Sequence, residues 1–181
     1  MAKRKSLDLI VLLIISVFVI SVSAGVYYSL EMTSTVDVMG ANVYFVLGAD
    51  NGTANVLISS DGMVGQLTTL EAYPNATTTY DDPIRVRNNG TGSYMIRLRH
   101  VDVSGDASNF VFVNFTLMGT TEVSLDYTTS GSNWTLPDPQ NTTSVSIPQD
   151  TEWSIKVETR AAAGASTGTA AISMTVDVES L

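Results

Sequence analysis

The sequence predicts an all-β protein, organised as a single β-sandwich of the jelly-roll or immunoglobulin-like type and preceded by an N-terminal hydrophobic helix. Two observations predict the sandwich. Apolar and polar residues alternate with a period of two over most of the chain after residue 25, and turn-forming residues interrupt that alternation at short intervals. A third observation, an uncharged apolar stretch near the N-terminus, predicts a helix that is a signal or a membrane anchor. The expected parts are residues 1–24 (signal peptide or anchor), 25–39 (an extended strand) and 40–181 (the sandwich).

The N-terminal segment has the features of a secretory signal. Lys3, Arg4 and Lys5 supply positive charge, and 22 uncharged, mostly apolar residues follow from Leu9 to Leu30. Small residues interrupt this run, so we expect signal peptidase to cut between Ala24 and Gly25. Cleavage there would give a secreted protein of the extracellular cell surface.

Two other interpretations of the same segment stay open. The stretch is long enough to cross a bilayer as a retained helix, and the chain would then touch the membrane only through residues 9–30. Alternatively, a type IV pilin-like precursor would be cut near Ser6, with Asp8 early in a helix that forms the core of a filament. All three interpretations place residues 31–181 outside the cytoplasm.

Residues 25–39 are expected to form an extended strand that can be donated to a neighbouring molecule. Six apolar residues alternate with mainly polar ones along it: Val26, Tyr28, Leu30, Met32, Val36 and Val38. A donated strand adds main-chain hydrogen bonds to an exposed sheet edge and places alternate side chains in pockets. Repeated head to tail, such a contact does not close and builds a filament. The alternative is an ordinary edge strand of the chain's own sheet.

Nine to eleven short strands are expected in the sandwich domain. Phe110–Leu117 is apolar on both faces except at Asn114, which predicts a central strand. A loop rather than a helix is expected at residues 161–168, because glycines, serine and threonine interrupt its alanines. The other alternating rows, in chain order, are those of Ala41–Leu47, Ile84–Arg87, Tyr94–Arg99, Val123–Tyr127, Val145–Ile147, Trp153–Val157 and Ile172–Glu179.

Asn-x-Ser/Thr sequons are the most informative motif downstream of the hydrophobic segment. Six of the ten asparagines are in sequons, whereas Ser and Thr supply 42 of 181 residues, so composition alone accounts for about two or three. A sequon is modified only when it is exported and exposed, so the excess predicts a glycoprotein. The expected acceptors are Asn51, Asn75, Asn89, Asn114, Asn133 and Asn141.

Composition excludes several classes of protein. The chain has no Cys, which removes disulfides, thiol nucleophiles and zinc–thiolate sites. Six basic and 17 acidic residues follow Gly25, and so acidic a surface repels nucleic acid and anionic lipid. We therefore expect no nucleic-acid partner.

Candidate chemical groups are few, and we expect no enzyme, no cofactor and no dedicated metal site. The single His, His100, is expected on the exposed strand face with Arg97 and Arg99. Asp81 and Asp82 are adjacent carboxylates, for which a turn or strand-entry role is favoured over catalysis. Oxygens for Ca²⁺ could come from loop residues that match no dedicated motif: Asp50, Asn51, Asp61, Asp81, Asp82, Asp102 and Asp106. Of the two tryptophans, Trp134 is expected to be exposed and Trp153 to be in the core.

Two stretches resemble a known family. The two stretches are Ser23–Met39 (SAGVYYSLEMTSTVDVM) and Tyr80–Leu98 (YDDPIRVRNNGTGSYMIRL). The first is similar to the processed start of the family's members, and the second is similar to their strand–turn–strand segment. The family comprises archaeal secreted filament subunits of the bundling-pilus and thread type and the camelysin/TasA-like biofilm-fibre proteins. The resemblance implies a short signal, an N-terminal donor strand and one jelly-roll-like domain. It also implies that residues 26–37 insert into the next subunit, and it offers no catalytic residue.

The function expected from the sequence is that of a structural subunit of an extracellular cell-surface filament. It would polymerise with identical subunits by donor-strand complementation and act in adhesion and biofilm cohesion, in contact with other cell-surface proteins or glycans. The alternatives are a membrane-anchored, glycosylated module that binds envelope or S-layer proteins, and a type IV pilin-like subunit.

Overall fold

A computed structural model of the chain describes residues 41–165 and 168–180. Within these ranges the protein is all-β with antiparallel sheets, as the alternation predicts, and it contains no α-helix. No helix in this part of the chain is long and apolar enough to cross a membrane. The predicted signal or anchor helix, the Ala24–Gly25 cleavage site and the donor segment lie outside the described residues, and so do the donor side chains Val26, Tyr28, Leu30, Met32, Val36 and Val38.

The described ranges hold eleven strands and one short 3₁₀ helix, η1 (Ala107–Asn109). The strands are β1 (Val43–Leu47), β2 (Val56–Ile58), β3 (Gly65–Leu67), β4 (Thr78–Asn88), β5 (Tyr94–Gly105), β6 (Phe110–Met118), β7 (Val123–Ser130), β8 (Asn133–Thr135), β9 (Val145–Ile147), β10 (Thr151–Ala161) and β11 (Ala170–Ser180). Each strand of eight or more residues contains a segment predicted as a strand from the sequence, and extends beyond it. Residues 162–165 form a turn and no helix, as expected from the glycines and the polar residues around them.

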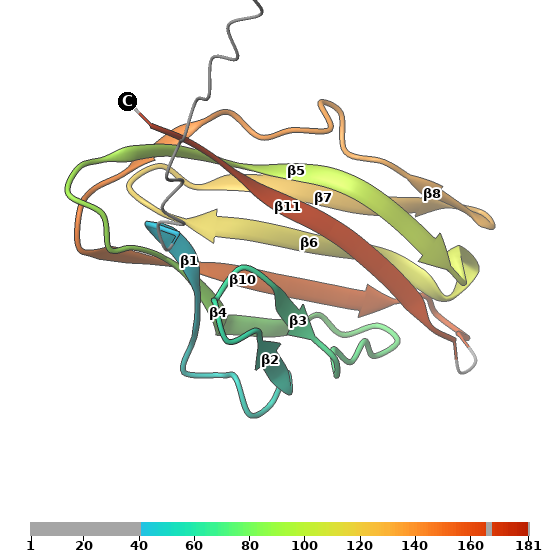
Figure 1. Ribbon diagram of the computed structural model, residues 1–181. Coiled ribbons are helices and arrows are strands. Elements are labelled where there is room, and N and C mark those ends of the chain that lie inside the picture. The colour runs from blue at the N-terminus through green and yellow to red at the C-terminus, as the bar shows by residue number, and fades with distance from the viewer. Residues whose placement is uncertain (1–40, 166–167, 181) are drawn as a thin grey trace, which may run out of the picture. The chain divides into compact units, whose positions relative to one another are not determined.

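The strands form three sheets (Figure 1). The large sheet has the order β1-β4-β10-β6-β7-β8, the small sheet has the order β11-β5-β9, and β2 pairs with β3 in a separate hairpin. β6 lies between β10 and β7 inside the large sheet, which confirms the prediction of a central strand at Phe110–Leu117. All the strand pairs in the described ranges are antiparallel.

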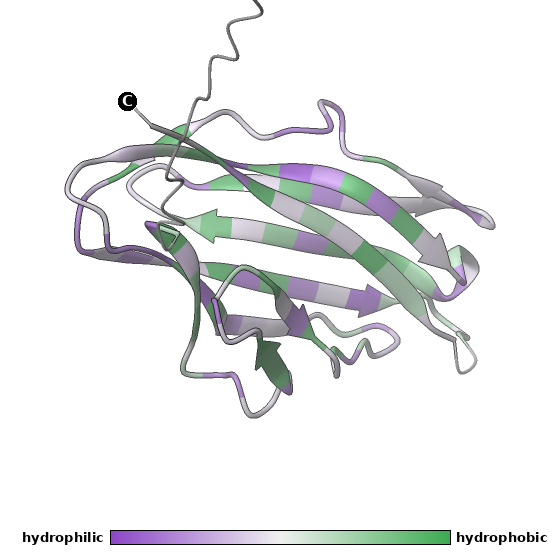
Figure 2. Cartoon of the chain, in the orientation of Figure 1, coloured by the Kyte–Doolittle hydropathy of each residue, from purple (hydrophilic) through white to green (hydrophobic). Residues whose placement is uncertain are grey.

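One hydrophobic core receives side chains from the large and the small sheet. Ile96 and Leu98 of β5 and Ile147 of β9 are fully buried, and β5 lies against β7 of the large sheet. On the large sheet, Leu125 and Val157 are equally buried. Alternate residues of each strand face this core because successive side chains of a strand point to opposite faces. Figure 2 shows hydrophilic and hydrophobic residues alternating along β5.

Strand β4 belongs to the large sheet and β5 to the small one, so the chain crosses between sheets at residues 88–94. Asn88, fully buried at the end of β4, ties this crossing together. Its Nδ2 atom donates to the carbonyl oxygens of Gly92, Ile147 and Pro148 at 2.8, 3.1 and 3.0 Å. Its Oδ1 atom accepts from the backbone N–H of Gly90 at 2.9 Å. The Asn-Asn-Gly segment therefore joins two sheets and does not close a hairpin.

Candidate functional site

The backbone edges of the two main sheets differ in how well they are protected. β1, at one edge of the large sheet, donates from the N–H of Phe45 to the carbonyl oxygen of Gly62 at 2.8 Å, so its outer side is partly paired. β8 and β9, at two further edges, have three residues each. Short or covered edges are the usual protection against unwanted strand pairing.

β11 is the exception among these edges. It has 11 residues, pairs with β5 along one side, and has no strand partner on its other side among residues 41–165 and 168–180. A long strand with one free side presents a row of unpaired N–H and C=O groups. The edge of β11 is therefore the most complete template for another strand in the described part of the protein.

The apolar row of β11 is also incompletely covered. Ile172, Met174 and Val176 pack against the core but are only half-buried, and Val178 is 41% exposed. The equivalent row of β10, which has a strand on each side, is buried along its whole length. Both rows have the same alternating pattern, so the difference comes from the neighbouring strand that β11 lacks in the described ranges. One more strand beside β11 would cover this row.

The opposite face of the small sheet carries a cluster of ion pairs. Asp177 of β11 accepts from Nε of Arg99 at 2.9 Å and from Nε of Arg97 at 3.1 Å. These bonds, that of Arg99 first, hold the pKa of the Asp177 carboxyl below its ordinary value. The face next to the open edge is therefore polar, whereas the core-facing side of the same strand is apolar.

The sequon asparagines lie at sites of different exposure. Asn75 and Asn89 lie in exposed connections, and Asn133 is exposed on the short edge strand β8. Asn51 and Asn141 are half-buried, and Nδ2 of Asn51 donates to the carbonyl oxygen of Gly48. Three of the six predicted acceptors thus combine a sequon with an exposed side chain.

The sixth acceptor, Asn114, lies inside the large sheet. It belongs to β6, opposite Asp126 of β7 and Glu158 of β10, and is half-buried. Its Oδ1 atom is enclosed and has no hydrogen-bond partner among the described residues. The position within the sheet and the enclosed Oδ1 atom make Asn114 a poor attachment site in the folded chain.

The adjacent carboxylates Asp81 and Asp82 lie within β4, not in a turn or at the entry to a strand as expected. The pairing of β10 with β4 jumps from Ile84 to Tyr80, so residues 81–83 form an irregularity in the ladder, which the buried Pro83 accompanies. Pro lacks the N–H that a regular ladder uses, and such a position suits a bulge.

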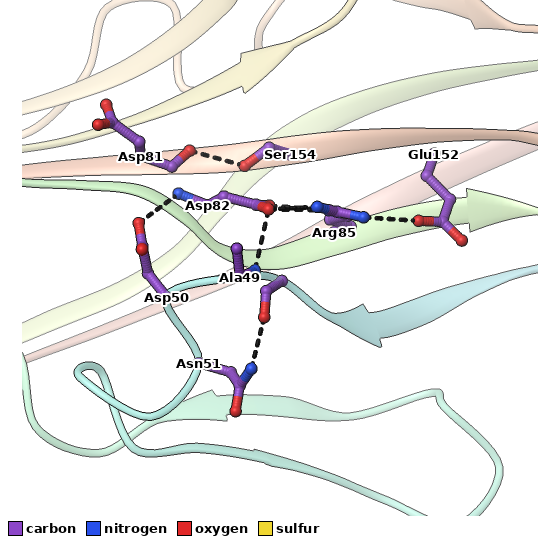
Figure 3. A network of polar contacts seen from close by, with 9 residues as sticks. Ala49, Asp50, Asn51, Asp81, Asp82, Arg85, Glu152 and Ser154 are labelled. Atoms are coloured by element: carbon purple, nitrogen blue, oxygen red, sulfur yellow. Dashed lines mark hydrogen bonds and ion pairs between the residues drawn. The ribbon is translucent and has the colours of Figure 1, made fainter.

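Asp82 holds a network of structural contacts (Figure 3). Its carboxylate accepts from the guanidinium of Arg85 and from the N–H of Ala49, and Arg85 in turn pairs with Glu152 at 3.0 Å. Asp50 accepts from the N–H of Asp82 at 2.9 Å. The bonds from Arg85 lower the pKa of Asp82 to about 2. The carboxylate links the residues that follow β1 to β4 and, through Arg85, to β10, and a group that is ionised at neutral pH and held in these contacts suits a structural role.

The candidate calcium oxygens are distributed over the molecule. In the described ranges no group of three or more His, Cys, Asp or Glu side chains converges on one point. Asp61 accepts from Ser59 and Met63, and Asp106 accepts from the N–H of Thr169. The bonds of Asp61 are local, whereas those of Asp106, Asp50 and Asp82 join segments far apart in the chain, so these carboxylates have structural contacts.

His100 faces the opposite way from the prediction. It is half-buried on the core side of β5, following Ile96 and Leu98, whereas Arg97 and Arg99 face outward. Its Nδ1 atom lies 3.1 Å from the hydroxyl oxygen of Tyr127, a fully buried residue whose pKa burial raises to about 12. The alternation places His100 on the inward face, where its imidazole is a hydrogen-bond partner for the hydroxyl of the buried Tyr127.

The two tryptophans are both part of the packing. Trp153 is 7% exposed and belongs to the core, as predicted. Trp134 is half-buried rather than exposed, and its ring packs against Phe110 with centroids 5.6 Å apart.

Sequence reasoning missed the open edge of β11 and the crossing held by Asn88, because neither has a local signal.

Comparison with models of known protein families found no match, and comparison with curated protein sequences found none either.

Proposed function

We propose that the chain is the structural subunit of an extracellular cell-surface filament that polymerises by donor-strand complementation. The described sheets would form one β-sandwich of the jelly-roll or immunoglobulin-like type, and residues 26–37 of one subunit would complete a neighbouring subunit. The proposed roles are adhesion and biofilm cohesion, in a secreted, glycosylated, non-enzymatic protein.

The observation that carries the proposal is the open, 11-residue edge of β11, with its half-buried apolar row. A strand that completes this edge needs about the same length and one apolar face. Residues 26–38 have both properties in the sequence, with apolar residues at every even-numbered position except Ser34 and mainly polar residues between them. A shared pattern on the two partners supports polymerisation over a soluble monomer, in which a long open edge invites aggregation.

Removal of the donor tests the proposal. Deleting residues 25–38 from the full chain is expected to give soluble, folded monomers, visible by electron microscopy as an absence of fibres and by sedimentation as a single small species. Leu30→Asp places a charge on the apolar row and is expected to abolish fibres. Ser29→Asp adds the same charge on the opposite face and is the matched control. Normal fibres from the deletion variant would remove the mechanism.

A membrane-anchored surface module remains the second candidate, favoured by the 22 uncharged residues from Leu9 to Leu30. The N-terminal residue of protein taken from cells and medium separates the candidates. Gly25 supports the secreted filament subunit, Met1 or Ala2 supports the anchored module, and Leu7 supports a type IV pilin-like subunit.

A further inference from the structure

We infer that a second copy of this chain docks its residues 26–38 on the open edge of β11 with its strand antiparallel to β11, an orientation that the chain cannot adopt along the whole of its own edge. The inference rests on the proposed function and adds to it the acceptor edge and the direction of the donor. The acceptor edge and the position of Asn42 come from the described residues, and the pattern and length of the donor come from the sequence.

The start of the described chain lies at one end of β11. The side chain of Asn42 donates to the hydroxyl oxygen of Tyr94 at 2.6 Å, and its carbonyl oxygen accepts from the N–H of Asn89. Tyr94 is paired with Ser180, at the C-terminal end of β11. Figure 1 shows the beginning of β1 and the end of β11 at the same end of the sheets.

The link between the donor segment and this point is short. Residue 38 is four peptide units from Asn42, which span at most about 15 Å. The 11 residues of β11 extend over about 33 Å from Ser180 to Ala170. Residue 38 of the same chain can therefore reach the part of the edge near Ser180 and cannot lie beside Ala170 at the far end.

This limit fixes the direction in which a chain can cover its own edge. With residue 38 near Ser180, residues 26–38 fill the edge only by running towards Ser180, in the direction of β11 itself. The resulting pair would be parallel. An antiparallel strand along the full edge needs residue 38 near Ala170 and residue 26 near Ser180, and only another molecule can supply it.

The sheets favour the antiparallel strand. Every strand pair in the described ranges is antiparallel, including that of β11 with β5. Antiparallel pairing is slightly more stable per residue, and sheets of one type are over-represented over mixed ones. Because the link to Asn42 is short, the chain can cover the whole of its own β11 edge only with a parallel strand. The more stable antiparallel orientation is available only to a strand from a neighbouring molecule.

The occupant also matches the edge in pattern. The apolar row of β11 (Ile172, Met174, Val176, Val178) would lie beside an apolar row of the donor formed by Val26, Tyr28, Leu30, Met32, Val36 and Val38. The polar face with Asp177 would meet the mainly polar donor residues between them. Neighbouring side chains on one face of a sheet interact in this way.

Cysteine cross-linking tests both the edge and the direction, because the chain has no Cys of its own. Donor variants Val26→Cys and Val38→Cys are each mixed before assembly with ¹⁵N-labelled acceptor variants Ile172→Cys or Val178→Cys, which lie near opposite ends of β11. A short bifunctional reagent of about 10 Å covers an uncertainty of about three residues in register. Mass spectrometry of the linked peptides identifies the pairs and, from the label, whether they join two molecules. Ser173→Cys, on the polar face of β11, is the matched control for the face.

The expected links are Val38→Cys with Ile172→Cys, and Val26→Cys with Val178→Cys, each between a labelled and an unlabelled molecule and at least tenfold above the exchanged pairs. Links between molecules in the exchanged pairs would overturn the antiparallel direction and leave strand donation intact. Fibres that form without any link to β11 would show that β11 is not the acceptor edge, and strand donation would again be left intact. A link of position 26 to position 172 within one molecule, tested in the double variant of a single chain, would show the chain covering its own edge and would overturn this inference and the proposed function together.

Discussion

Asn88 is expected to be one of the most sensitive polar residues of the protein, and its replacement tests the structure of the crossing between the two sheets. The side chain is fully buried, and its amide has two hydrogens for the carbonyl oxygens of Gly92, Ile147 and Pro148. Asn88→Ala removes about two full hydrogen bonds at Nδ2 and one at Oδ1, where the N–H of Gly90 donates.

The magnitude follows from what these groups lose. A buried polar group left without a partner costs about 1–3 kcal/mol, and a net hydrogen bond contributes about 1 kcal/mol. Water can reach the partly buried carbonyls of Gly92 and Pro148 after the change, whereas Ile147 and Gly90 are buried. We therefore expect Asn88→Ala to lower the free energy of unfolding by about 3–4 kcal/mol.

Two variants separate hydrogen bonding from packing. Asn88→Asp keeps the shape of the side chain but replaces the donating amide with an acceptor that faces three carbonyl oxygens, so its loss should be at least as large as that of Asn88→Ala. Asn89→Ala, at the exposed neighbouring position and in protein made without glycans, should change stability by no more than about 0.5 kcal/mol. Urea unfolding followed by tryptophan fluorescence measures all three, since Trp153 is buried in the core. An Asn88→Asp protein within about 1 kcal/mol of the parent would refute the assigned hydrogen bonds.

Three further predictions follow from other contacts. The pKa of Asp82 in the folded chain is about 2, below its ordinary 3.8, so its carboxylate stabilises the fold above about pH 4 and loses this effect as the pH falls towards 2. Asp82→Asn should therefore lower the free energy of unfolding by about 1–2 kcal/mol at pH 7, after allowance for partial exposure, and hardly change it at pH 2. Urea titrations measure both values, and an equal loss at the two pH values would contradict the ion pair. Gly48→Ala should lower the free energy of unfolding by more than about 2 kcal/mol, because the new Cβ would lie 2.0 Å from the carbonyl oxygen of Asp82. Gly52→Ala is the control and should be nearly neutral in the same assay, since its new Cβ would have no atom within 4 Å. Glycopeptide mass spectrometry should find sugars on the exposed Asn75, Asn89 and Asn133 and none on Asn114. Asn114→Gln should leave the total mass of attached glycans unchanged. An occupied Asn114 would show that attachment precedes formation of the large sheet.

The strands themselves were predictable because their signal is local. An apolar run on both faces identified the central position of β6. Alternation of apolar and polar residues reports which side chains share a face, and it identified β10 and β11. The same rule explains the error at His100, which was assigned to the face of Arg97 and Arg99 although the alternation of β5 places it with Ile96 and Leu98. The all-β class of the fold therefore follows from the sequence alone, as does the acidic, cysteine-free composition that excludes disulfides.

Within residues 41–165 and 168–180, the tertiary structure alone decided which strand has a free side. The rows of β10 and β11 look alike in the sequence, yet β10 lies between β4 and β6 whereas β11 has β5 on one side. It also decided that Asn88 is buried while the adjacent Asn89 is exposed, and that Asn42 lies beside Tyr94. The reason is that alternation encodes the facing of each side chain within a strand, whereas pairing depends on backbone hydrogen bonds between segments far apart in the chain, whose donors and acceptors are the same in every residue except proline.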